Sequence, residues 1–218
     1  MKAENTYVDV ASAEILDPKF ETTKQFLEVC EVALENGRPK VARFNETYSE
    51  DKAIVYFEVK DENYFIEVHV SKGPKVEVHS VWTESGHRVY LTATSKELSF
   101  TQLSDQLINF NPLTGWSKGD LRKNNASKHT FSRVSFEPIK NQAYGLNEKL
   151  DLLLTELERD IEGVRELGKK TKAIIAVCRR QYVSGNAGIH LDSRTVDRLH
   201  QLGLGIDIDT YIEGQEIR

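Results

Sequence analysis

The chain has 218 residues, of which 39% are hydrophobic and 29% are charged, a balance that suits a soluble globular protein with one large domain or two small ones. No apolar run approaches the roughly 20 residues that span a bilayer, and the first residues lack the apolar stretch of a signal peptide. We therefore expect a soluble, cytoplasmic protein with no membrane partner.

The net charge of −5 is spread unevenly along the chain. Residues 1–86 carry 10 lysines and arginines against 17 aspartates and glutamates, whereas residues 87–218 carry 19 against 17. Nucleic-acid binding needs a basic footprint, so the acidic N-terminal half argues against a nucleic-acid partner. It is compatible with a basic protein partner, because complementary charge speeds encounter. An acidic surface that only keeps the protein soluble is the alternative.

The first predicted element is a helix that begins near Pro18 and ends at Gly37, which Pro39 follows closely. A weaker pattern at residues 39–44 suggests a short strand after it. The apolar residues at roughly helical spacing are Phe20, Phe26, Leu27, Cys30, Val32 and Leu34. Cys30 and the distant Cys178 both lie in apolar patterns, so we expect buried free thiols, as is usual in the cytoplasm.

Four strands with alternating apolar residues are predicted next, at residues 53–59, 64–70, 76–82 and 89–94. Turn-forming residues separate them, including Gly73-Pro74 and Ser85-Gly86. Short connections force neighbouring strands to pair antiparallel, so the sequence predicts a β-meander with the helix covering one face. We place this helix-plus-meander domain at residues 1–86, although the strand at 89–94 could belong to either half.

The C-terminal part changes rhythm, beginning with a short helix capped near Ser99 that should bury Leu103, Leu107 and Ile108. A loop at residues 109–128 and a strand at 130–136 follow. A long amphipathic helix from near Asn147 comes next. Its apolar stripe consists of Leu150, Leu153, Leu154, Leu157, Ile161 and Val164.

The last elements are a strand, a helix and a final strand. Residues 172–178 are almost continuously apolar, which predicts a central strand. Asp192 or Ser193 should cap the last helix and Gly203 should end it, and the final strand should turn Leu204, Ile206 and Ile208 inward. The predicted class is therefore α+β: an N-terminal helix plus an antiparallel β-meander, followed by an α/β sandwich-like half with alternating strands and helices at residues 87–218.

Several segments of the C-terminal half resemble the bacterial domain of unknown function 4279. They are residues 89–112, the run Thr-Gly-Trp-Ser-Lys-Gly-Asp at 114–120, the leucine-rich helix at 150–157, Leu202-Gly203, and Asp-Ile-Asp-Thr-Tyr at 207–211. The N-terminal meander lies outside the resemblance. Some members of the family look like immunity proteins that bind polymorphic toxins, and the resemblance implies such a role by analogy only. It supplies no catalytic residue and no cofactor.

The acidic meander supplies the candidate partner-binding residues. We expect carboxylates there to cover a basic catalytic cleft of a cognate toxin by stoichiometric occlusion, with a tryptophan as the aromatic anchor. For Trp116 the alternative is that the indole folds back on the core. The candidate contacts are Glu58, Asp61, Glu67, Glu77, Trp82 and Trp116.

A metal site is a weaker alternative. His69 and His79, with Glu67 and Glu77, could share one face of the hairpin turned at Gly73-Pro74 and bind zinc, but solvated or partner-facing side chains are the favoured reading. Asp207 and Asp209 alone offer too few ligands for a divalent cation and should form a polar outer strand face.

The sequence contains no G-x-S-x-G, H-E-x-x-H or paired C-x-x-C motif. We therefore predict a protein that is not an enzyme and needs no cofactor or metal. The alternative to an immunity protein is a module that self-associates or binds a small ligand. A metal-dependent hydrolase ranks last.

Overall fold

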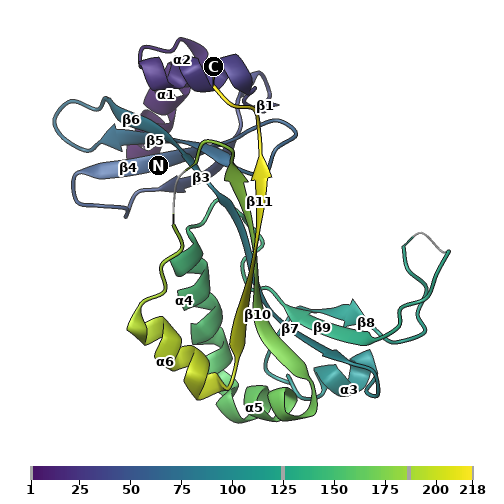
Figure 1. The fold of residues 1–218 in the computed structure, drawn as a ribbon. Helices are drawn as coiled ribbons and strands as arrows, with labels where there is room; N and C mark the ends of the chain where they lie inside the picture. Colours follow the sequence, from purple (N-terminus) through teal and green to yellow (C-terminus); the bar gives the residue numbers. More distant parts are fainter. Residues whose placement is uncertain (1, 124–125, 186–187, 218) are drawn as a thin grey trace.

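Two β-sheets, each with helices on one face, make up the fold in the computed structural model, which describes residues 2–123, 126–185 and 188–217 (Figure 1). A four-stranded sheet in the order β3-β4-β5-β6 lies in the upper part of Figure 1, and a five-stranded sheet in the order β11-β10-β7-β9-β8 lies below it. The predicted α+β class is confirmed. None of the described helices is long and apolar enough to cross a membrane.

Two helices, α1 (Lys2–Leu16) and α2 (Glu21–Val29), cover one face of the four-stranded sheet. Sequence reasoning missed α1, which buries only a narrow stripe that includes Ala11 and Ile15. The helix predicted to reach Gly37 instead ends at Val29. The chain then forms a hairpin of β1 (Leu34–Glu35) and β2 (Arg38–Pro39).

The residues predicted to end that helix turn this hairpin. Asn36 and Gly37 have positive φ angles of 52° and 78°, as a tight two-residue hairpin turn requires. Gly37 was predicted to end a helix, but its positive φ angle serves a β-turn. The glycine signal alone did not distinguish a helix end from a hairpin.

The meander consists of β3 (Val41–Asn45), β4 (Lys52–Glu58), β5 (Phe65–Ser71) and β6 (Val78–Glu84). All three pairings are antiparallel, as predicted. The face toward α1 and α2 is apolar because the side chains alternate along each strand. Its fully buried members include Val55, Phe57, Ile66, Val68 and Val70.

The strand predicted at residues 89–94 does not belong to this meander. β7 (Gly86–Ser95) follows β6 directly but pairs with β9 and β10 of the other sheet. Ser85-Gly86 is thus not a hairpin turn but the point where the chain passes from one sheet to the other. A Cβ at Gly86 would collide with the main-chain oxygen of Asn63, so only glycine allows this crossing.

The remaining strands of the second sheet are β8 (Leu113–Trp116), β9 (Ser132–Phe136), β10 (Lys172–Tyr182) and β11 (Gly205–Glu213). β10 is central, as predicted, and runs antiparallel to β7 and parallel to β11. The segment predicted as a loop at residues 109–128 contains β8. Residues 124–125 of that segment lie outside the described residues.

The helices α3 (Phe100–Ser104), α4 (Leu146–Leu157), α5 (Ile161–Lys170) and α6 (Ser193–Leu202) pack on one face of this sheet in a single core. The predicted caps Ser99 and Asp192 are correct. Ile108, predicted to be buried, is 82% exposed, because the chain leaves α3 before reaching it. Its neighbour Leu107 is buried as expected.

The single long helix predicted from near Asn147 is broken in two. A 3₁₀ turn at Glu158–Asp160 separates α4 from α5, and the Asp160 side chain caps α5 by accepting a 2.9 Å hydrogen bond from the Gly163 amide. The predicted leucine stripe still faces the core on both sides of the break. The apolar residues keep their helical spacing from α4 through the 3₁₀ turn into α5, so their pattern in the sequence does not show where the helix breaks.

The two halves are joined by contacts as well as by the chain. Tyr182, at the end of β10, is buried in the core of the four-stranded sheet, where its ring lies 5.1 Å from that of Tyr64. The Asn63 amide donates a 2.9 Å hydrogen bond to Glu213 of β11. The division into domains at residue 86 stays a prediction.

A substitution at Gly86 tests whether only glycine allows the chain to pass from one sheet to the other. We expect Gly86→Ala to lower the free energy of unfolding by at least about 2 kcal/mol, because the added methyl group overlaps main chain that cannot move aside. Gly73→Ala is the matched control, since no atom lies within 4 Å of its added Cβ, and should change stability by less than about 1 kcal/mol. Urea unfolding of both variants measures this, and equal effects would refute the steric argument.

Candidate functional site

The junction between the two sheets gathers charged side chains from both halves. The face of the four-stranded sheet opposite α1 and α2 points toward the start of α4. A small apolar cluster of Ile54, Tyr56, Phe65 and Ala143 lies there. Strand register also brings Arg43, Tyr56, Glu67 and Trp82 side by side across all four strands of this face.

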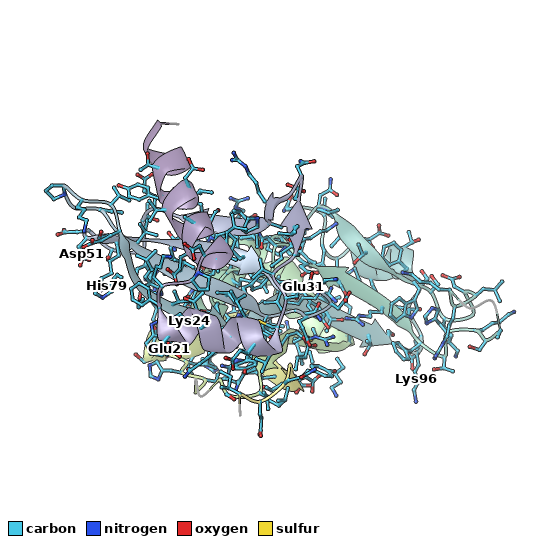
Figure 2. The ribbon with its side chains drawn as sticks, turned by 90° about the horizontal axis from the view of Figure 1, so that it is seen from above. Glu21, Lys24, Glu31, Asp51, His79 and Lys96 are labelled. Carbon is cyan, nitrogen blue, oxygen red and sulfur yellow. The ribbon has the colours of Figure 1, made fainter. Side chains whose placement is uncertain are left out.

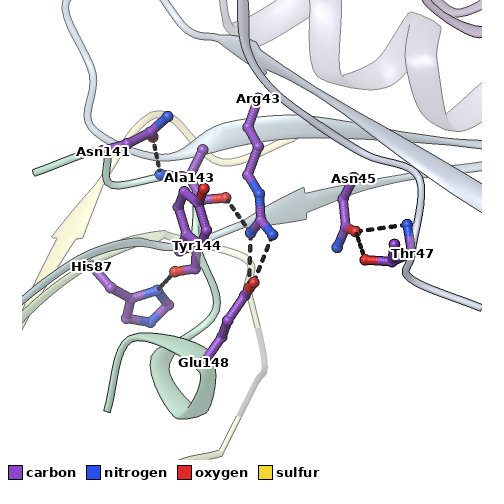
Figure 3. A network of polar contacts seen from close by, with 8 residues as sticks. All are labelled: Arg43, Asn45, Thr47, His87, Asn141, Ala143, Tyr144 and Glu148. Carbon is purple, nitrogen blue, oxygen red and sulfur yellow. Dashed lines mark hydrogen bonds and ion pairs between the residues drawn. The ribbon is translucent and has the colours of Figure 1, made fainter. Parts of the chain in front are cut away.

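Arg43 on β3 fastens this face to α4 (Figure 3). Its two terminal nitrogens donate 2.8 Å and 2.7 Å hydrogen bonds to the two carboxylate oxygens of Glu148, and one of them also reaches the Ala143 carbonyl at 3.3 Å. The guanidinium carbon lies 3.5 Å from the centre of the Tyr144 ring. Bidentate pairing plus stacking on an aromatic ring makes this a strong and directional contact.

Glu84, the last residue of β6, lies on the same face. Burial, and after it the nearby negative charge of Glu67, raise the pKa of its carboxyl to about 7, against the opposing effect of Arg179 and Arg43. The carboxylate accepts a 2.9 Å hydrogen bond from the Ser85 amide. Among the described residues it forms no ion pair.

Glu67 and Trp82 are cross-strand neighbours beside Glu84. The Glu67 side chain is only 14% exposed, and its Oε1 lies 3.3 Å from Nε2 of His69, outside hydrogen-bond geometry. Trp82 is 54% exposed, an unusual position for a large aromatic ring. An exposed indole therefore stands next to two poorly exposed carboxylates.

Two further titratable side chains, Lys149 and His87, are buried at the junction. Lys149 is 2% exposed, and its ammonium donates 2.7 Å and 2.9 Å hydrogen bonds to the carbonyls of His87 and Asn141. Burial lowers the pKa of Lys149 to about 8. His87 is 3% exposed, and burial together with the charge of Arg179 lowers its pKa to about 4, so the imidazole is neutral at pH 7.

Two pockets flank Glu84 and Arg179, and both residues line both of them. The first, the edge pocket, has a volume of about 490 Å³ and runs along β6 and the end of β10. The second, the helix pocket, has a volume of about 270 Å³ and lies at the start of α4. The edge pocket also includes Glu67 and Trp82. A pocket of about 480 Å³ beside α1 lacks a comparable gathering of buried charges.

Of the six residues predicted to bind a partner, the structure brings together only Glu67 and Trp82. Glu58 lies on the same face but pairs with Lys40 at 2.6 Å. Asp61 lies in the turn after β4, with a φ angle of 62°. Glu77 pairs with Lys75 at 2.5 Å. The predicted carboxylates therefore do not form one continuous acidic face.

Trp116 lies on β8, in the other sheet. Its ring nitrogen donates a 3.0 Å hydrogen bond to the Phe131 carbonyl, and its ring stacks on His129 with 4.3 Å between ring centres. The Arg133 guanidinium lies 5.4 Å from the Trp116 ring centre. The half-buried indole is thus held by local contacts with residues 129–133 and is not part of the apolar core.

The zinc alternative fails on strand register. A β-bulge between His69 and Val70 leaves His79 without a partner in the pairing of β5 with β6. Figure 2 shows His79 beside Asp51 at one end of the molecule. Within the described parts of the chain, no group of three or more histidine, cysteine, aspartate or glutamate side chains could hold a metal ion. Asp207 and Asp209 are exposed on β11, as predicted.

Sequence reasoning missed Arg43, Glu84, Lys149 and Arg179. Lys149 left a signal, because it occupies a position on the leucine-rich face of α4 where an apolar residue is expected. Arg179 left another, since it continues the inward alternation of β10 after Ile175 and Val177. Arg43 and Glu84 looked like ordinary polar residues of half-exposed strands.

Comparisons with known proteins give one family. The family model described as Domain of unknown function (DUF4279) matches residues 84–213, more than half of the chain. Searches among curated proteins and among solved structures found no match. The matched segment begins at Glu84 and contains the helix pocket and all of β7, β10 and β11, whereas most of the four-stranded sheet lies outside it.

The ion pair between Arg43 and Glu148 predicts that replacing Arg43 destabilises the fold. We expect Arg43→Met to lower the free energy of unfolding by about 2–3 kcal/mol, because Glu148 then loses a bidentate charged partner. Arg38→Met is the control, since its side chain is 81% exposed and a change there should stay within about 0.5 kcal/mol. Urea unfolding at pH 7 compares the two, and equal losses would contradict the assigned role.

Glu84 predicts a pH dependence of stability. Its folded-state pKa of about 7 exceeds its usual value of 4.5, so the folded protein holds a proton that the unfolded chain releases between these pH values. Wild-type stability should therefore fall relative to Glu84→Gln as pH rises through this window.

We expect Glu84→Gln and wild type to differ little below pH 4.5, and the variant to be more stable by about 1–2 kcal/mol above pH 7. His87 also makes stability depend on pH, but both proteins contain it, so its effect cancels in the difference. Urea unfolding from pH 4 to pH 8 measures the difference. A difference that does not change with pH would show that the Glu84 pKa is not raised.

Proposed function

Since this chain belongs to the family of the domain of unknown function 4279, which assigns no activity, we propose that it is a non-enzymatic immunity protein that binds and occludes a cognate toxin. The observation that carries the proposal is the exposed Trp82 beside Glu67 and Glu84 in the edge pocket. In this role the protein acts in the cytoplasm, where the toxin would otherwise reach its target.

The two carboxylates support a basic partner. Among the described residues neither is paired with lysine or arginine, and the ionisable nitrogen nearest to Glu67 in an ion-pair geometry is that of His69. Their shared burial makes the negative charge costly, as the raised pKa of Glu84 records. A cation from a partner would relieve this cost with charge-assisted hydrogen bonds.

Trp82 suits the centre of such an interface. A tryptophan can bury a large area with little loss of side-chain entropy, and its ring face attracts an arginine or lysine that approaches the carboxylates. The edge pocket, at about 490 Å³, has room for a long basic side chain. β6 is also an edge strand of its sheet, so no further strand stands in the way of a partner.

The mechanism follows from where basic side chains occur in toxins that act on anionic substrates. Lysines and arginines in such a catalytic cleft normally meet the substrate, and pairing them with Glu67 and Glu84 would keep the substrate out. Glu58 and Glu77 are already paired with lysines, so they would add little to the long-range attraction of a basic partner. Asp61 lies outside the pocket and could contribute only to encounter.

The test begins with capture of a partner by the immobilised chain from a lysate of its source organism, followed by purification of that partner. We expect Trp82→Ala to weaken the purified complex about 30-fold, which corresponds to about 2 kcal/mol, and Glu67→Lys to weaken it at least as much. Glu77→Lys makes the same charge change outside the pocket and should cost less than about 5-fold at physiological salt. Calorimetric titration gives the affinities.

The immunity role has its own readout. One equivalent of the chain should abolish the activity of the captured partner, and Trp82→Ala should restore that activity. If the edge-pocket variants bind like wild type, the proposed surface is wrong. If the partner is bound but keeps its activity, occlusion is wrong.

Self-association is the alternative outcome. Light scattering on the purified chain would then show a stable dimer that Trp82→Ala dissociates.

A further inference from the structure

The helix pocket contains the open start of α4. The N-cap residue is Gly145, which has no side chain to cap the helix, and no side-chain cap is formed. The first intrahelical hydrogen bond at this end is donated by the Lys149 amide to the Gly145 carbonyl at 3.0 Å. The amides of residues 146–148 are therefore without an intrahelical acceptor, and the helix dipole adds partial positive charge there.

Arg179 is the second feature of this pocket. It is only 5% exposed, and its Nε donates a 3.3 Å hydrogen bond to the Ser85 hydroxyl. Arg179 lines the pocket, and no hydrogen bond or ion pair joins its terminal nitrogens to another described residue. These nitrogens are not among the fully buried polar atoms that lack a partner, and their free donor groups suit an anionic ligand.

His87 lines the same pocket and is 3% exposed. Its Nδ1 lies 3.1 Å from the Tyr144 carbonyl, which can only accept, so Nδ1 carries the proton and Nε2 is left as an acceptor (Figure 3). A neutral imidazole adds no charge, but it can accept a hydrogen bond from a protonated oxygen of a ligand.

The negative groups at the pocket do not cancel Arg179. Glu148 gives both carboxylate oxygens to Arg43. Glu84 is half-buried, and its high pKa allows it to be protonated near neutral pH. The pocket therefore combines a cation, open amide donors and no committed anion.

We propose that the helix pocket binds a small oxyanion, the carboxylate or phosphate group of a metabolite, between the amides at the start of α4 and the Arg179 guanidinium. Helix N-termini and arginine forks both favour such groups. The volume of about 270 Å³ lies just below the range of roughly 300–1,000 Å³ of sites for drug-sized ligands, so a small metabolite fits and a dinucleotide does not. The site shares Glu84 and Arg179 with the edge pocket but does not include Trp82.

The first test is calorimetric titration of the whole chain with sodium phosphate, sodium sulfate and sodium acetate at pH 6.5 and low salt, with sodium chloride as the reference. We expect saturable binding of one equivalent of at least one oxyanion. Phosphate and sulfate without acetate would identify a phosphate-type ligand, and acetate alone would identify a carboxylate.

Arg179→Gln should weaken this binding by about 10-fold or more, because it removes the buried charge and one arm of the fork. Arg38→Gln makes the same charge change on a side chain that is 81% exposed and should bind like wild type. Because Arg179→Gln could disturb the fold, a second variant is needed.

Gly145→Asp provides that variant. Gly145 has a φ angle of −57° and a ψ angle of 150°, which aspartate readily adopts at an N-cap, and no atom lies within 4 Å of the added Cβ. The new carboxylate should cap the open amides, raise the melting temperature slightly and abolish oxyanion binding. Gly145→Ala adds only the Cβ and should still bind.

The outcomes separate clearly. Binding that is lost in both Arg179→Gln and Gly145→Asp, and kept in both controls, supports the site. No saturable binding of any of the three anions, or equal binding in all variants, overturns it. Trp82→Ala leaves the helix pocket intact, so loss of partner binding in that variant with oxyanion binding retained would distinguish the two proposals.

Discussion

The bidentate contact between Arg43 and Glu148 fixes the charge balance of the whole junction. It occupies the only arginine on the inner face of the four-stranded sheet within the described residues, so Glu67 and Glu84 have no strong cation of their own. It also occupies the only carboxylate in the first turn of α4. A single ion pair thus removes one arginine and one carboxylate from the junction. Glu84 and Arg179, which line both pockets, are left without an ion pair among the described residues.

Burial between the two sheets explains the perturbed groups without any special chemistry. Desolvation disfavours whichever form is charged, so it raises the pKa of Glu84 to about 7 and lowers that of His87 to about 4. Shifts of this kind gather at functional sites but also in structural ion networks. Lys149 is the structural case, because its ammonium is fully used by two carbonyls. Arg179 is not, because its terminal nitrogens are unused.

Local pattern predicted most strands and caps, because alternation and capping depend on residues a few positions apart. Capping at Ser99 and Asp192 and the central position of β10 are such features. The position of β7 in the second sheet depends on the close approach of Gly86 to the main chain of Asn63. The two residues are far apart in the chain, so a local sequence pattern does not reveal this contact. The same limit applies to the site, since Arg43 and Glu148 are 105 residues apart in the chain. Lys149 on the leucine-rich face of α4 and Arg179 on the inward face of β10 were the clues that the sequence carried.

Glu84 and Arg179 line both pockets, so the two proposed sites should be energetically coupled. The charge of Arg179 now lowers the pKa of Glu84, which means that it partly offsets the negative potential in the edge pocket. An oxyanion bound to Arg179 would remove that offset and strengthen the attraction of Glu84 and Glu67 for a cation. Linkage requires the reverse effect to be equal, so a bound basic partner would tighten the oxyanion by the same factor. The affinity of the partner surface would then depend on a small anion, because one charge on β6 and one on β10, in different sheets, line both pockets.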